Sequence, residues 1–290
     1  METWEEEARV KALRPDACRA GNPAAGSIRP VNRFGHLEFD ESLPSRSASL
    51  HPQVSDEARC LTEAEVAFGR GEFESALRWY GKVQEHNPAN ASAWIGQVKC
   101  LIELGQYKEA NVWADKALER YPDAAELLAA KAVALGRMGR ATEAMPFSDA
   151  AMEKPGEIAW VWLARGDVLL ASGLKQVDAC FDRALRLAPG DWLVRWLAGR
   201  IRAYWKQFAL ALKHVREALS FAPDRPSVWI TMAECQLALG LADAARQSVD
   251  QALSLSPEHP AALEMLRGID EQGWLEQMGG TFRRWLGRGA

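Results

Sequence analysis

The chain has 290 residues, of which 48% are hydrophobic and 26% are charged, and its formal net charge is −4. This composition is ordinary for a folded domain, and the mild excess of acidic residues gives the whole chain no attraction for nucleic acid or for an anionic membrane. No apolar run approaches the roughly 18 residues that a membrane-spanning helix needs, so we expect neither a nucleic-acid-binding nor a membrane-spanning protein.

Residues 1–55 show no periodic hydrophobic pattern and are rich in Arg, Pro, Ser and Ala. A segment of this kind buries too little apolar surface to fold alone, so we expect an N-terminal arm that is disordered or ordered by a partner, with a short helix near residues 3–13. The acidic first residues do not predict a signal peptide. The five cysteines are widely spaced, which favours a reducing compartment, and we expect a cytoplasmic protein.

Six prolines mark a nearly constant period in the rest of the chain, with separations of 34, 33, 34, 34 and 34 residues. They are Pro88, Pro122, Pro155, Pro189, Pro223 and Pro257. Glycines and alanines follow the same period, as Gly71 and Ala76 do before Pro88. A period of this length is typical of a solenoid built from one repeated supersecondary unit.

Residues 89–122 show the unit most clearly, as two helices joined by a tight turn. Trp94 opens helix A, Gly105 lies in the turn, Ala110 marks helix B, and Pro122 ends that helix. Glycine permits the turn, and proline cannot continue the helix. The small alanines let helices A and B approach closely.

This pattern resembles the tetratricopeptide repeat, a helix-turn-helix unit of about 34 residues, over about 70% of the chain. The resemblance implies an all-α, right-handed superhelical solenoid of about six repeats, spanning residues 56–257. The expected units are 57–88, 89–122, 123–155, 156–189, 190–223 and 224–257.

Departures from the period predict a local irregularity around residues 145–175 rather than a break. The third unit is one residue short before Pro155, and the turn of the fourth carries an extra residue near Gly173. Pro146 lies in the first turn of a helix B, where proline is tolerated. The fifth unit has Lys206 where the turn glycine is expected.

Residues 258–290 are expected to form a capping helix over 258–278 and a basic, aromatic tail. An apolar cluster beside arginines predicts a contact with a partner. We therefore take the tail as a second docking site, formed by Phe282, Arg283, Arg284 and Trp285.

The sequence contains none of the short motifs that bind phosphate, dinucleotides or catalytic zinc, and no nucleophile elbow. Its five histidines are scattered. We therefore expect no catalytic residues, no metal site and no cofactor, and we do not expect an enzyme.

The resemblance also implies that the A helices line a concave groove. By register, position 9 of the six units places Glu65, Lys99, Val133, Arg165, Arg200 and Glu234 there. Together with neighbouring positions this predicts a basic groove with aromatic walls, in which the binding residues are Lys99, Arg137, Arg165, Trp196, Arg200 and Tyr204. Arginine and aromatic residues are enriched at binding hot spots. The alternative is that these are solvated charges and packing aromatics.

The sequence therefore predicts a scaffold or adaptor that binds a partner protein or peptide in this groove. A basic, aromatic groove favours a ligand that is acidic and partly apolar. A second hypothesis is an accessory subunit of a larger enzyme or secretion assembly, docking through the arm and the tail. Membrane association is expected, if at all, only through the tail.

Overall fold

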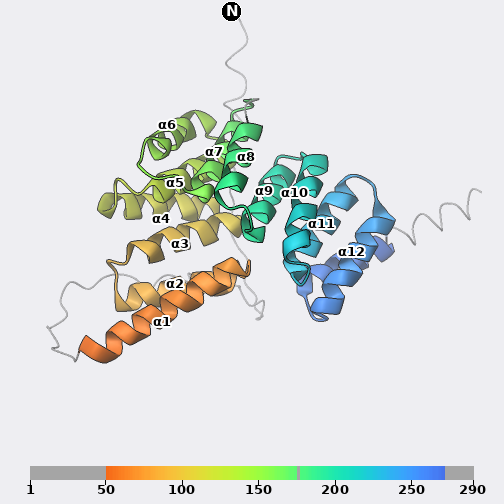
Figure 1. Ribbon diagram of the computed structural model, residues 1–290, viewed down its shortest axis with the longest axis horizontal. Coiled ribbons are helices and arrows are strands. Elements are labelled where there is room, and N and C mark those ends of the chain that lie inside the picture. The colour runs from red at the N-terminus through yellow and green to blue at the C-terminus, as the bar shows by residue number, and fades with distance from the viewer. Residues whose placement is uncertain (1–49, 175–176, 272–290) are drawn as a thin grey trace, which may run out of the picture. The chain divides into compact units, whose positions relative to one another are not determined.

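The computed structural model describes residues 50–174 and 177–271, and all regular secondary structure in these ranges is helical (Figure 1). The labelled helices are α1 (Leu50–Gly69), α2 (Phe73–His86), α3 (Ala91–Glu103), α4 (Tyr107–Arg120), α5 (Ala125–Arg137), α6 (Ala141–Met152), α7 (Ala159–Ala171), α8 (Asp178–Leu187), α9 (Trp192–Tyr204), α10 (Phe208–Phe221), α11 (Pro226–Ala238) and α12 (Ala242–Leu255). A further helical segment covers residues 260–271.

Consecutive helices pair as the two arms of each repeat, from α1 and α2 in the first to α11 and α12 in the sixth. Each A helix also packs on the next one, as α5 does on α7 and α7 on α9. The expectation of an all-α repeat solenoid is confirmed. α1 begins at Leu50, within the range that we assigned to the arm. The prediction missed its first turns because they carry none of the marker residues of the period.

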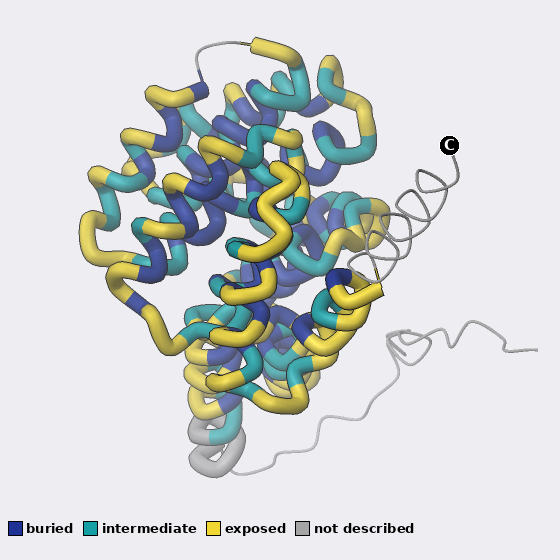
Figure 2. Tube along the Cα trace, turned by 90° about the vertical axis from the view of Figure 1, so that its right-hand side faces the viewer, coloured by how far each residue is buried: buried dark blue, intermediate teal, exposed yellow. Residues whose placement is uncertain are grey.

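The periodic alanines lie where the helices touch. The alanines that recur at the position of Ala76 are fully buried, with 0% of their surface exposed: Ala76, Ala110, Ala144, Ala211 and Ala245. Larger side chains, such as Phe181 and Trp94, fill the spaces between the helix pairs. Figure 2 shows the resulting alternation of buried and exposed positions along each helix.

The turn inside each repeat has a left-handed residue directly after helix A. Glycine holds this place with a φ of 68° to 80° in five repeats, and Lys206 holds it in the fifth with a φ of 60°. The same pair of backbone hydrogen bonds closes the turn, from Lys206 N to Ala203 O and from Gln207 N to Arg202 O. The fold therefore imposes a conformation on Lys206 that L side chains disfavour.

The expected irregularity lies between α6 and α8. Pro146 is inside α6, residues 153–158 form an irregular loop in which Gly156 has a φ of 92°, and α8 is only 10 residues long. The stack continues across it, since α7 packs on α5, α6 and α9.

The helical segment 260–271 covers the last repeat. Ala262 and Ile269 pack into one apolar cluster with Ile230 of α11 and Val249 of α12. The open apolar side of the sixth repeat is thereby removed from water, as the end of a solenoid requires. The remainder of the predicted capping helix and the tail lie outside the described residues, as do residues 1–49.

Candidate functional site

A cleft of about 720 Å³ lies among the residues predicted to bind a partner. Its walls come from the turns after α1 and α3, the C-terminal end of α5, α9 with the start of α10, and α11 with the residues that follow α12. Repeats distant in sequence thus meet around one opening. Four of the six predicted residues line it: Arg137, Trp196, Arg200 and Tyr204.

Contacts between the first two repeats and the fifth bring these walls together. Phe73 stacks on Trp196 with ring centroids 5.7 Å apart and planes 7° apart, and Arg200 binds Glu103. Gly71 lies so close to the same indole that a Cβ at this position would be 2.5 Å from Cζ3 of Trp196. We call this set, Gly71, Phe73 and Glu103 against Trp196 and Arg200, the closing contact.

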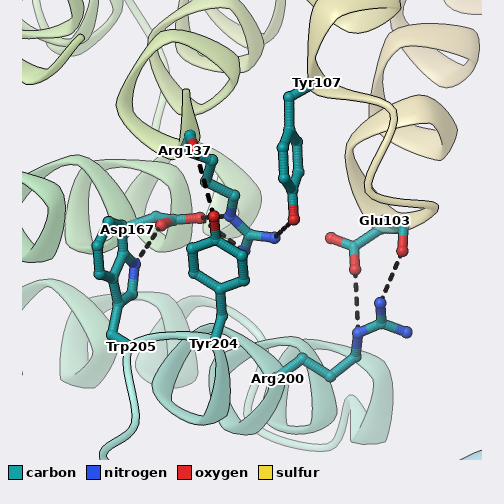
Figure 3. A network of polar contacts seen from close by, with 7 residues as sticks. All are labelled: Glu103, Tyr107, Arg137, Asp167, Arg200, Tyr204 and Trp205. Atoms are coloured by element: carbon teal, nitrogen blue, oxygen red, sulfur yellow. Dashed lines mark hydrogen bonds and ion pairs between the residues drawn. The ribbon is translucent and has the colours of Figure 1, made fainter. Parts of the chain in front are cut away.

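Arg200 reaches the cleft wall with a side chain that is 29% exposed. Its Nε lies 3.2 Å from Oε2 of Glu103, and its Nη2 donates to the backbone oxygen of Glu103 at 2.7 Å (Figure 3). Its guanidinium also lies 5.0 Å from the ring centre of Trp196. Among the described residues, Nη1 of Arg200 has no hydrogen-bond acceptor, so this arginine keeps a donor for a ligand.

Arg137 is committed to the protein itself. Its Nε and Nη2 bind Oδ2 of Asp167 at 2.9 and 2.8 Å, and its Nη1 donates to the hydroxyl of Tyr107 at 3.2 Å (Figure 3). The side chains of Arg137 and Asp167 are only 6% and 2% exposed. Burial opposes the charged form, but the Asp167 carboxylate outweighs it and raises the pKa of the Arg137 guanidinium. Arg137 and Asp167 thus form a buried ion pair that has no net charge.

The same network fixes two aromatic residues at the end of α9. Trp205 donates from Nε1 to the other oxygen of Asp167 at 2.7 Å, and the Tyr204 hydroxyl donates to the backbone oxygen of Arg137 at 3.2 Å. Tyr204 is 40% exposed, and its ring meets that of Tyr107 edge-on. Tyr204 is therefore the accessible aromatic surface of the cleft.

Trp196 differs from the expectation of an exposed groove wall, because only 1% of its surface is exposed. Its Nε1 donates to Oγ1 of Thr231 at 2.9 Å, and its ring stacks between Phe73 and Trp192. The closing contact covers its face. Trp196 supports the floor of the cleft and is not a surface for a ligand in this conformation.

Lys99 and Arg165 do not line the cleft. The Lys99 ammonium pairs with Glu126 and lies 4.7 Å from the ring centre of Trp160. The Arg165 guanidinium pairs with Asp149 at 2.6 Å and donates to Ser148 at 3.0 Å. Each of the four predicted cations thus has a carboxylate partner, and the groove is much less basic than its arginines and lysine alone indicate.

The cleft also contains two glutamates and a histidine that are not among the predicted binding residues: Glu103, Glu234 and His259. Glu234 lines the cleft, and desolvation by the surrounding protein raises the pKa of its carboxyl group, against a smaller opposite effect of Arg200. Its place at position 9 of the sixth repeat is the signal that identifies it. His259 follows the last repeat, so no repeat register could place it.

A family model described as the tetratricopeptide repeat matches residues 67–134 and 206–268. These matches support the assignment of the chain to the tetratricopeptide repeat family. Both matched stretches contribute residues to the cleft, so the site is built from tetratricopeptide repeats and the helical segment that follows them.

Solved tetratricopeptide repeat structures resemble this chain at low identity. YrrB, described as having an unusual peptide-binding site, is 21% identical over 64% of this chain and 96% of its own, with a TM-score of 0.38. A protein from Parabacteroides merdae is 15% identical over 73% and 84%, with a TM-score of 0.49. A Thermus thermophilus protein is 16% identical over 73% and 98%, with a TM-score of 0.45. No curated protein matches the chain in sequence.

Two absences hold for the described residues, 50–174 and 177–271. No helix there is both long and apolar enough to cross a membrane. No three His, Cys, Asp or Glu side chains in the same ranges lie where they could hold a metal ion together. The second docking site predicted in the tail, Phe282, Arg283, Arg284 and Trp285, lies outside those ranges.

Proposed function

We propose that this protein is an adaptor that binds a segment of a partner protein in the cleft between α3, α9 and α11. The tetratricopeptide repeat is in general a scaffold for protein–protein interaction. The observation that carries the proposal is the cleft itself: its volume, about 720 Å³, is in the range of ligand-binding pockets. Its apolar surfaces lie beside a few convergent polar groups, which is the usual composition of such a site.

The ligand that we propose is an extended peptide or a partner helix with acidic and apolar side chains. Arg200 supports the acidic part, because it lines the cleft and its Nη1 has no acceptor among the described residues. Arginine binds carboxylates with charge-assisted hydrogen bonds. Tyr204, Leu104 and Phe208 offer the apolar part. We also propose a cytoplasmic location, supported by four buried free thiols, Cys60, Cys100, Cys180 and Cys235.

A selection with a phage-displayed library of random peptides on the immobilised full-length protein tests this function. The selected peptides are synthesised, and their dissociation constants are measured with the wild type and with Tyr204→Ala. Loss of an exposed aromatic anchor is expected to weaken binding at least tenfold.

Tyr121→Ala is the matched control. The Tyr121 hydroxyl also donates to a backbone oxygen, that of Ala89, but the residue lies outside the cleft. This variant is expected to bind within twofold of the wild type. Failure to select any peptide, or equal affinities of the wild type and Tyr204→Ala, contradicts binding in the cleft.

A further inference from the structure

One wall of the cleft carries a carboxylate that the protein does not neutralise. Glu234 projects from α11, and within the described residues it has no hydrogen bond and no ion pair. Arg200 is the cation that influences the ionisation of Glu234. That guanidinium is held by the side chain and the backbone oxygen of Glu103, so it is not free to close on Glu234.

Two glutamates and two arginines line the cleft, but one of these arginines is paired with a carboxylate that does not line it. Arg137 pairs with Asp167, and Arg200 pairs with Glu103. Among the described residues Glu234 therefore has no ion-pair partner, and burial already disfavours its ionised form. A partly desolvated carboxylate gains most from a cation that brings hydrogen-bond donors with it.

The groups beside Glu234 do not supply such a donor. The hydroxyl of Thr231, one helical turn earlier, donates to the backbone oxygen of Ser227 and accepts from Trp196. Nδ1 of His259, on the same wall, is buried without a partner in the described part of the chain. Within residues 50–174 and 177–271, no side chain donates a hydrogen bond to Glu234.

We infer that the cleft binds a cationic group, the lysine or arginine side chain of a partner segment, against Glu234. This inference rests on the proposed function and adds a second charge to its ligand. The segment presents a carboxylate to Arg200 and a basic side chain to Glu234, with an apolar residue against Tyr204. A ligand with only acidic groups would leave Glu234 unpaired and would repel it.

The peptide selection described above tests the inference when it is repeated with Glu234→Gln. Peptides selected on the wild type are expected to carry Lys or Arg at one shared position, enriched at least fivefold over the library. Peptides selected on Glu234→Gln are expected to lack this enrichment. Glu119→Gln is the control, because Glu119 is an exposed glutamate outside the cleft.

Acetylation of the shared lysine gives the direct measurement. It removes the positive charge and keeps the aliphatic chain, and it is expected to weaken binding about tenfold on the wild type and less than twofold on Glu234→Gln. Thermal denaturation of each variant confirms that it is folded.

Two outcomes separate this inference from the proposed function. Peptides that require Tyr204 but show no basic preference, or that lose affinity equally on acetylation with both proteins, overturn the inference and leave binding in the cleft intact. Failure to select any peptide overturns both.

Discussion

Replacing Gly71 with alanine measures the closing contact in isolation. Two costs are expected. Gly71 has a φ of 74°, and an L residue in this region loses roughly 1–2 kcal/mol. The new Cβ would also lie 2.5 Å from Cζ3 and 2.8 Å from Cη2 of Trp196. That indole is held by Phe73 and Thr231, and overlap in a packed site costs roughly 1–3 kcal/mol more.

Gly139→Ala is the matched control, because Gly139 has a φ of 80° and an added Cβ there would meet nothing within 4 Å. It carries the backbone cost alone. We expect the free energy of unfolding to fall by about 2–5 kcal/mol for Gly71→Ala and by about 1–2 kcal/mol for Gly139→Ala, measured by urea denaturation followed by circular dichroism.

The protein can also relieve the overlap by separating Gly71 from Trp196. In that case the difference in the free energy of unfolding between Gly71→Ala and Gly139→Ala cannot exceed the free energy of the closing contact. Hydrogen exchange at residues 196–200 would then rise in Gly71→Ala and stay unchanged in Gly139→Ala. Equal losses of stability, with equal exchange at 196–200, would refute the contact.

Three further predictions concern individual side chains. Lys206→Gly is expected to raise the free energy of unfolding by about 1 kcal/mol, because it relieves a left-handed L residue; a loss of stability in urea would contradict this. Asp167→Ala is expected to cost roughly 3–5 kcal/mol by leaving Arg137 buried and unpaired, whereas Asp123→Ala, at an exposed ion pair, costs less than about 1 kcal/mol; similar losses in urea would refute the reasoning. Burial lowers the pKa of His214, so the folded state binds fewer protons than the unfolded state as the pH falls below about 6.5. Stability should decrease over that interval and stay level above it, and His214→Asn should flatten the profile; an unchanged profile in that variant excludes His214 as the cause.

The sequence predicts the repeat well because the period follows from contacts between helices of the same repeat. Ala110 and Ala211 are buried because helix B of a repeat must approach helix A of the same repeat, and this requirement recurs at a fixed separation. The deviation at Lys206 is visible for the same reason: the turn demands the same backbone at that place in every repeat, whatever the side chain.

The groove is harder to predict because its residues meet through the curvature of the stack. Glu103 and Arg200 are 97 residues apart, and their approach depends on small rotations accumulated over three repeats. Register predicts equivalent positions such as Lys99 and Arg200, but not the carboxylates that neighbouring repeats supply, such as Glu126 for Lys99. It also does not indicate that Trp196 is covered by the turn at Gly71.

The closing contact gives this solenoid a fixed number of repeats between its two halves. In an open stack of units that touch only their neighbours, a unit can be inserted or deleted at the cost of its own interfaces. Here the first and fifth repeats must return to each other, so one unit more or fewer between them would move Gly71 away from Trp196 by a full step of the superhelix. We therefore expect inserted or deleted repeats to be tolerated beyond α12 and not between α2 and α9, because only the latter would separate the two sides of the closing contact.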